Sequence, residues 1–279
     1  MPITITTSEQ ILLSKMHLPV RPKILVNIIT EAKKNEPNMY LISQWISEDV
    51  GVASAVLKIV NSPLFARQTN IISIQQAVML LGFNRVFSIV KTVALKGTFT
   101  NTHKLSTFWQ LSAQIAHTAI NIAHFLDKPE YGDSAYVLGL FHMSGVPTLY
   151  ENFEGYQNTF EIHQCQGWDA VAKQERSLYQ TSHTTLSAFI AQQWDLTPSQ
   201  VEAIFYVFDC DGIFESDELS QEALTIFTIL KIARRCVFQH CNIENESEWS
   251  AIKEGIESFL QIDETDLEEL IFQTEHQFD

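Results

Sequence analysis

The sequence predicts an all-α fold, a helical bundle with two lobes. Apolar residues recur at the spacing of one helix face along nearly all of the 279 residues, and no convincing series of alternating strands is present. The ten glycines and eight prolines fall mostly between these periodic segments, where helices are expected to end. With 46% hydrophobic and 18% charged residues, the chain has enough apolar surface to form a packed core.

Short helices make up the first lobe, which we place at residues 1–105. Pro37 marks a loop, because the residue before a proline disfavours helix. Asp49 is a good N-cap for the helix behind it, and Ser73-Ile-Gln-Gln fits a capping box for the next helix, which Gly82 is expected to stop. Together with the apolar spacing, these signals predict helices over residues 22–34, 39–46, 49–61, 73–82 and 86–96.

Longer helices are predicted in the second lobe, residues 106–241. The first of them stops before Pro129, and Gly145-Val-Pro147 is expected to be a non-helical segment that separates two helices. Thr197-Pro198 is typical of an N-cap followed by proline at the first helical position. We predict helices over residues 105–126, 134–142, 149–153, 158–165, 168–179, 184–194, 198–208 and 217–239.

The end of the chain, residues 242–279, is strongly acidic. It carries 12 Asp/Glu and one Lys. Its apolar residues recur on one face of two predicted helices, 248–260 and 265–273, so we expect amphipathic helices packed on the body rather than a loose tail.

Charge is distributed unevenly along the chain. Residues 1–105 carry 11 Lys/Arg and 5 Asp/Glu, residues 106–241 carry 6 and 16, and the whole chain has a net charge of −15. Ordinary solvated helix faces explain this asymmetry most simply, while attraction between the lobes or a basic face for a partner is the alternative. The basic residues of the first lobe are scattered singles rather than a dense stripe, so nucleic-acid binding is not expected.

Several classes of protein are disfavoured by what the sequence lacks. No apolar run approaches the roughly 18 residues of a membrane span. The start of the chain has no basic region followed by an apolar stretch, so we expect no signal peptide and a cytoplasmic protein. The four cysteines include no CxxC pair, and the GxGxxG, Walker A, HExxH and GxSxG motifs are absent.

Histidines are the natural candidates for metal chemistry. A two-metal hydrolase needs several histidines with carboxylates between them, because bridging oxygens hold the two cations and activate water. His117, His142 and His183 lie on or beside predicted helices, but Met143 follows His142, and a thioether cannot bridge two hard cations. Taken singly, each histidine is more simply a hydrogen-bonded core residue, and we expect no bound metal and no cofactor.

Four segments in order along the first lobe carry a family resemblance. They are Leu18-Pro-Val-Arg-Pro22, Ile46-Ser-Glu-Asp-Val50, Val56-Leu-Lys-Ile-Val-Asn-Ser62 and Ser73-Ile-Gln-Gln-Ala-Val-Met-Leu-Leu-Gly82. These segments resemble motifs of the HDOD domain of bacterial signalling proteins, and the resemblance extends over about residues 10–240. It implies an all-helical fold related to the HD phosphohydrolases, which include the HD-GYP cyclic di-GMP phosphodiesterases.

The same resemblance locates the positions that hold metal in the hydrolases. It places His117 at the first ligand, His142-Met143 at the His-Asp pair and His183 at the next histidine. Val207-Phe208 takes the place of a His-His pair, and Arg234 falls near the last aspartate. About four of the seven ligand positions are therefore lost, which implies a vestigial pocket without metal.

The resemblance implies a non-catalytic signalling or regulatory protein that acts through a protein partner. The alternative is a nucleotide or other small-ligand sensor that uses the vestigial pocket, where Arg234 could pair with a phosphate. A working metal-dependent phosphohydrolase is the third and weakest reading. Four residues of the family motifs sit at helix ends and are expected to be structural: Asp49, Asn61, Ser62 and Gly82.

Overall fold

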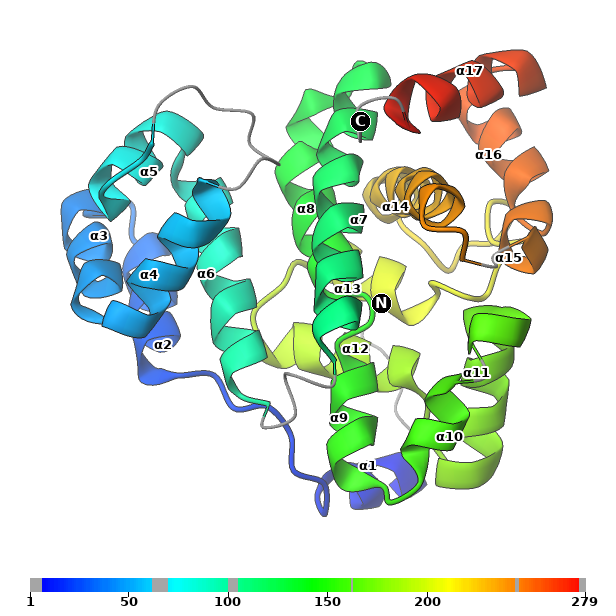
Figure 1. The fold of residues 1–279 in the computed structure, drawn as a ribbon, viewed down its shortest axis with the longest axis horizontal. Coiled ribbons are helices and arrows are strands. Elements are labelled where there is room, and N and C mark those ends of the chain that lie inside the picture. Colours follow the sequence, from blue (N-terminus) through cyan, green and yellow to red (C-terminus); the bar gives the residue numbers. More distant parts are fainter. Residues whose placement is uncertain (1–6, 62–69, 100–104, 162, 244–245, 276–279) are drawn as a thin grey trace. The chain divides into compact units, whose positions relative to one another are not determined.

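The computed structural model describes residues 7–61, 70–99, 105–161, 163–243 and 246–275. Within these ranges the chain forms 17 α-helices, one short 3-10 helix and no strand, which confirms the all-α fold (Figure 1). The chain divides into a smaller unit, residues 19–102, and a larger unit, residues 1–18 and 103–279. No helix in the described ranges is long and apolar enough to cross a membrane.

The first helix, α1 (Thr7–Leu13), belongs to the larger unit, whereas we expected residues 1–105 to form one lobe. Just behind α1, the side chain of Asn152 holds the backbone of His17. The His17 N–H donates to Asn152 Oδ1 at 2.7 Å, and Asn152 Nδ2 donates to the His17 carbonyl at 3.0 Å. Helical spacing carries no information about a pairing between residues this far apart, so the sequence could not reveal it.

The smaller unit is a cluster of five helices around an aliphatic core (Figure 1). Leu25, Ile42, Val56 and Ile89 come from four of these helices, and all four side chains are fully buried. Each helix overlaps one that the apolar spacing predicts. The helices are α2 (Lys23–Ala32), α3 (Met39–Glu48), α4 (Val50–Val60), α5 (Ile74–Leu81) and α6 (Phe83–Gly97).

The helix ends of the smaller unit show what its motif residues do. Asp49 caps α4, since its Oδ1 accepts the backbone N–H three residues on at 3.0 Å. Gly82 separates α5 from α6 with φ of 80°, a left-handed conformation that favours glycine. The side chain of Asn61 pairs with the N–H and the carbonyl of Ile71, both at 2.7 Å, and so ties together two segments, while its backbone N–H donates to the Leu57 carbonyl at the end of α4. Ser62 lies outside the described residues.

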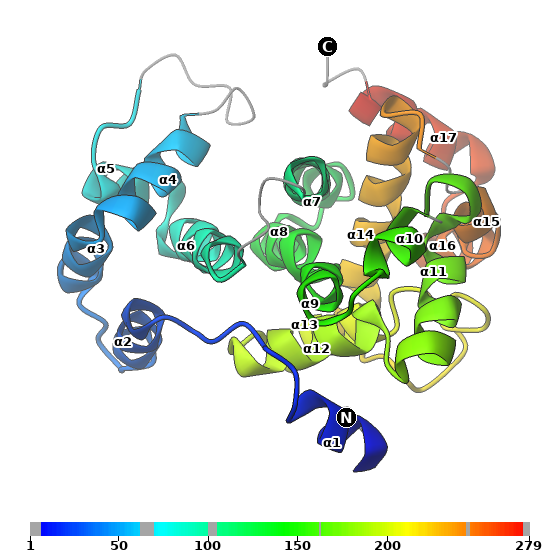
Figure 2. The same ribbon diagram turned by 60° about the horizontal axis from the view of Figure 1, so that its bottom comes forward.

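The larger unit is built around α14, which lies between α7 and α8 on one side and α17 on the other (Figure 1, Figure 2). Helices α7 and α8 approach closely, because a Cβ on Gly139 would lie 2.5 Å from the Cα of Ala116. The helices of this unit are α7 (Ser106–Phe125), η2 (Pro129–Tyr131), α8 (Gly132–Phe141), α9 (Gly145–Asn152), α10 (Tyr156–Glu161), α11 (His163–Tyr179), α12 (His183–Gln193), α13 (Pro198–Phe205), α14 (Gln221–His240), α15 (Glu246–Ser250), α16 (Lys253–Leu260) and α17 (Glu264–Glu275).

Two predictions for the larger unit need correction. Helix α9 starts at Gly145, where we expected a break, because Pro147 falls in the first turn of the helix and its missing N–H is not needed there. The predicted helix over 248–260 is two helices that meet at Ile252. The acidic end of the chain is nevertheless packed, since Ile256 of α16 and the apolar face of α17 are buried.

Candidate functional site

His142 and Arg234 meet in the interior of the larger unit. His142 directly follows α8, Arg234 lies on α14, and neither has exposed surface. Arg234 Nη1 lies 2.8 Å from His142 Nε2, and His142 Nδ1 lies 2.9 Å from the carbonyl of Gly139. A guanidinium can only donate, so the imidazole is neutral and carries its proton on Nδ1. Burial and the charge of Arg234 lower the pKa of His142 well below its usual range.

Glu248 of α15 completes this group as the partner of two buried cations. Arg234 donates to both carboxylate oxygens, from Nε to Oε1 at 2.9 Å and from Nη2 to Oε2 at 2.7 Å. Lys231 Nζ, one turn earlier on α14, donates to Oε1 at 2.7 Å. Burial would raise the pKa of Glu248, but the two cations overcome it and lower the pKa to about 2. We call His142, Lys231, Arg234 and Glu248 the ion cluster.

Aromatic and apolar side chains enclose the ion cluster. The centroid of the Phe208 ring lies 5.0 Å from Arg234 Cζ and 5.1 Å from Lys231 Nζ, distances at which the ring face attracts a cation. Met143 is buried beside His142 in sequence, and Val207 is fully buried. The two positions where the family resemblance places a His-His pair are thus occupied by a core side chain and a cation-binding ring.

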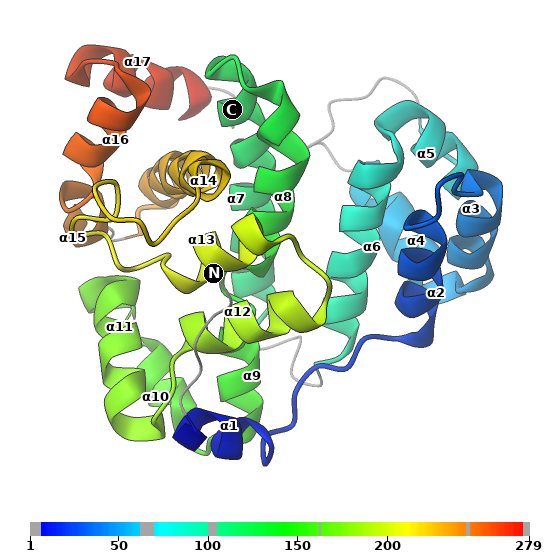
Figure 3. The ribbon, with the colours of Figure 1, turned by 180° about the vertical axis from the view of Figure 1, so that it is seen from behind.

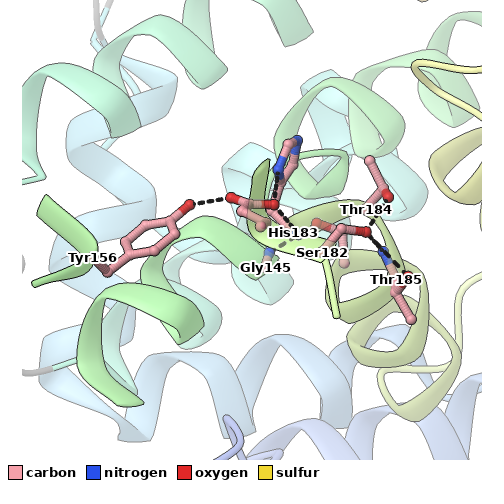
Figure 4. Close-up of polar contacts among 8 residues, drawn as sticks. Gly145, Tyr156, Ser182, His183, Thr184 and Thr185 are labelled. Atoms are coloured by element: carbon pink, nitrogen blue, oxygen red, sulfur yellow. Dashed lines mark hydrogen bonds and ion pairs between the residues drawn. The ribbon is translucent and has the colours of Figure 1, made fainter. Parts of the chain in front are cut away.

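A second buried network is built on Glu175 of α11 (Figure 4). The hydroxyl of Tyr156 donates to Glu175 Oε1 at 2.5 Å, while the backbone N and the Nδ1 of His183 both lie 2.7 Å from Oε2. Burial and the Glu175 charge raise the pKa of Tyr156 well above its usual range, so its phenol stays a donor. The ring of His183 packs against Trp168 and Phe208, each at 5.4 Å between centroids, and its Nε2 has no hydrogen-bond partner among the described residues.

Gly145 brings α9 against α12 (Figure 3). A Cβ at this position would lie 2.1 Å from the His183 carbonyl oxygen and 2.8 Å from Leu186 Cβ, and the Gly145 N–H donates to Ser187 Oγ at 2.8 Å (Figure 4). The sequence predicts Gly145 only as part of a break between two helices. Because Gly145 has no side chain, the backbones of α9 and α12 can also approach each other closely at His183.

The structure brings together some of the predicted site residues and separates others. His142 and Arg234 are in direct contact, and His183 belongs to the Glu175 network. Phe208 touches both groups, since its ring contacts His183 and the two cations. His117 is half-buried on α7, and we assign it no role.

The ion cluster does not fit the two-metal site of an HD phosphohydrolase. The His142 nitrogen that would face a metal is engaged by a guanidinium, and two buried cations would repel a divalent ion. In the described part of the chain, no three His, Cys, Asp or Glu side chains are grouped as metal ligands would be. The donors that remain are therefore unsuited to hold or to bridge metal ions.

Sequence reasoning missed Lys231, Glu248, Glu175 and Tyr156. One signal was available for the first two. Lys231 and Arg234 are three apart on a helix rich in apolar residues, a pattern that favours burial of both, and buried cations require a carboxylate partner. Nothing in the sequence indicates which of the 33 acidic residues that partner is.

Comparisons with known proteins place this geometry in context. The curated protein YuxH of Bacillus subtilis is 37% identical over 59 residues, which cover 21% of this chain and only 14% of that protein. A Shewanella amazonensis structure, provisionally named a phosphohydrolase, superposes with a TM-score of 0.67 at 20% identity and 94% and 92% coverage of the two chains. A Marinobacter aquaeolei structure, provisionally named a signal transduction protein, gives 0.69 at 17% identity, covering 98% of this chain and 59% of that one.

These structural matches show the fold alone, because their sequence identities are low. The family itself is shown by the sequence, since the model of the HDOD domain matches residues 18–209, which is more than half of the chain. The helical fold and the ordered motifs of the smaller unit agree with that match. The chain belongs to the HDOD domain family.

Proposed function

We propose that this HDOD protein is a non-catalytic component of bacterial signal transduction that acts through contacts with another protein. One observation carries the proposal: the guanidinium of Arg234 lies between His142 and Glu248, with a hydrogen bond to each side. The family resemblance places His142 and Arg234 at positions that hold metal ligands in the related hydrolases. Here a side chain of the protein neutralises the carboxylate and uses the lone pair of the histidine.

A phosphohydrolase would need a different arrangement at this place. Its metal-bound water must be held beside a substrate phosphate, and both must reach the site. The four side chains of the ion cluster are at most 5% exposed. The group is closed by its own hydrogen bonds, which supports a structural role for these four residues.

The small-ligand alternative has less support from the same geometry. A phosphate that paired with Arg234 would have to displace the Glu248 carboxylate, which already makes a two-point contact with the guanidinium. It would also have to separate Lys231 from that carboxylate. The proposal therefore assigns the signalling role to the surface of the protein rather than to this interior site.

A turnover assay tests the proposal. The purified chain is incubated with Mn²⁺, Mg²⁺ or Fe²⁺ and either cyclic di-GMP or a chromogenic phosphodiester, alongside a His142→Ala variant whose folding is checked by circular dichroism. We expect the two proteins to give the same background rate, because a contaminating phosphatase would act equally in both preparations. Metal-dependent hydrolysis that is present in the wild type and lost in the variant would overturn the proposal.

A further inference from the structure

A cavity of about 360 Å³ lies at the surface of the larger unit. One wall comes from the segment between α13 and α14, residues 206–220, and the other from α16 and the turn before it (Figure 3). The two walls meet closely at Gly255, because a Cβ there would lie 2.4 Å from the Phe214 ring. That ring also packs against Phe227 and Phe259, at 6.2 Å and 5.4 Å between centroids, so its position is fixed.

The lining of this cavity combines apolar surface with carboxylates. Phe214, Ala251 and Ile252 supply the apolar part, and Glu215 and Glu254 supply one carboxylate from each wall. Within the described part of the chain, neither side chain has a hydrogen bond or an ion pair, and no Lys or Arg lines the cavity. We call this site the acidic cavity. Two carboxylates without a counter-ion attract a cation.

The surface around the acidic cavity has the same sign of charge. Residues 206–220 contain five acidic residues, all of them exposed, and no Lys or Arg. Lys231 of the ion cluster lies behind the Cys210 thiol, to which it donates at 3.5 Å, and it is buried and bonded to Glu248. It therefore does not line the cavity. The net charge of −15 adds a general attraction for a basic partner.

The apolar walls favour an organic cation over a metal ion. Ca²⁺ takes about six to eight oxygen ligands and Mg²⁺ about six, which these walls cannot supply. No three His, Cys, Asp or Glu side chains of the described ranges are grouped as metal ligands would be. A lysine or arginine side chain has an apolar stem that can cover Phe214 and Ile252, while its charged end pairs with a carboxylate at the rim.

We propose that the acidic cavity binds a basic side chain from an exposed segment of a partner protein. The inference rests on the proposed function, because it names the chemistry of the partner that the signalling role requires. A second copy of the chain is disfavoured as this partner, since two chains with a net charge of −15 repel each other.

Fluorescence anisotropy of a labelled peptide of alternating arginine and alanine, at about 50 mM NaCl, tests the proposal. We expect saturable binding to the wild-type chain and none of the citrulline counterpart, which has the same shape without the charge. The double variant Glu215→Gln/Glu254→Gln should weaken binding by about three- to thirtyfold, as the loss of two exposed ion pairs does. Ser258→Trp, which places a large side chain at the exposed edge of the cavity, should weaken it at least about tenfold at unchanged charge.

Glu130→Gln/Glu154→Gln is the matched control, since it removes two exposed carboxylates elsewhere in the same unit. It should change the dissociation constant by less than about twofold, because salt screens distant charges. Equal weakening by the two double variants would reveal diffuse attraction and would overturn the proposal. So would the absence of saturable binding, equal binding of the citrulline peptide, or a folded Ser258→Trp variant that still binds. None of these outcomes bears on phosphodiester turnover, so failure of this site is distinguishable from failure of the proposed function.

Discussion

Replacing Glu248 with glutamine should destabilise the folded chain by about 3–5 kcal/mol, the usual cost of removing one partner from a buried ion pair. Glu248 is only 5% exposed and accepts three hydrogen bonds from charged donors. Glutamine keeps the shape of the glutamate side chain but removes its negative charge. Its N–H₂ group would face the N–H donors of Arg234 or Lys231, which it cannot accept. Arg234 and Lys231 would then remain buried without a counter-ion.

The lowered pKa of Glu248 gives a second value for the loss of stability expected from Glu248→Gln. A pKa of about 2 in the folded chain, against the ordinary 4.5, corresponds to about 3 kcal/mol of stabilisation. Because the folded pKa is depressed, this stabilisation is fully present above pH 4.5 and is lost as the pH falls toward 2. The difference between wild type and Glu248→Gln should therefore shrink by roughly 1 kcal/mol between pH 7 and pH 3.5.

Urea unfolding of both proteins at the two pH values measures this difference. At pH 7 a loss of about 3 kcal/mol should also lower Tm by about 6–12 °C in a protein of this size. Glu246→Gln is the matched control in the same helix, since the Glu246 side chain is 64% exposed and its pair with Arg235 should contribute less than about 1 kcal/mol. The stabilising role of Glu248 in the ion cluster is contradicted if Glu248→Gln is no more destabilising than Glu246→Gln. It is also contradicted if the effect of Glu248→Gln does not change with pH.

Two further substitutions test the packing and the Glu175 network by thermal unfolding. Gly145→Ala should destabilise the chain by about 1–3 kcal/mol or more, because the new Cβ would overlap the His183 carbonyl oxygen. In the control Gly97→Ala, the new Cβ meets no atom within 4 Å, so this change should be neutral or slightly stabilising. Equal effects of the two substitutions would contradict the close contact of α9 and α12. Tyr156→Phe should cost about 1–3 kcal/mol, because it removes the donor to Oε1 of the buried Glu175; an unchanged Tm would contradict that hydrogen bond.

Local signals in the sequence were sufficient for most of the fold. Asp49, Ser73 and Thr197 all cap helices as their spacing indicates, because a cap is a contact within three residues of the chain. At Ser73 the capping box is incomplete, since Gln76 accepts the N–H of Ile72 instead of that of Ser73. The full box occurs at Thr197, where we expected only a cap and a proline.

The chemistry of the site was less accessible, because its decisive contacts join distant segments. The family resemblance located His142, His183 and Arg234, but whether they meet depends on how α8, α12 and α14 pack. Glu248 lies 14 residues after Arg234, in a segment that we judged only by its amphipathic spacing. Helix periodicity shows that such a segment packs, and it does not show which carboxylate is carried into the core.

The metal content of the purified chain tests the central claim most directly. The protein, freed of any affinity tag and never exposed to chelator, is incubated with Mn²⁺ or Fe²⁺, desalted and measured by plasma mass spectrometry. We predict a stoichiometry near zero, because Arg234 and Lys231 supply the positive charge that metal ions supply in the hydrolases. One or two transition-metal ions bound per chain, and lost on substitution of His142, would contradict the account.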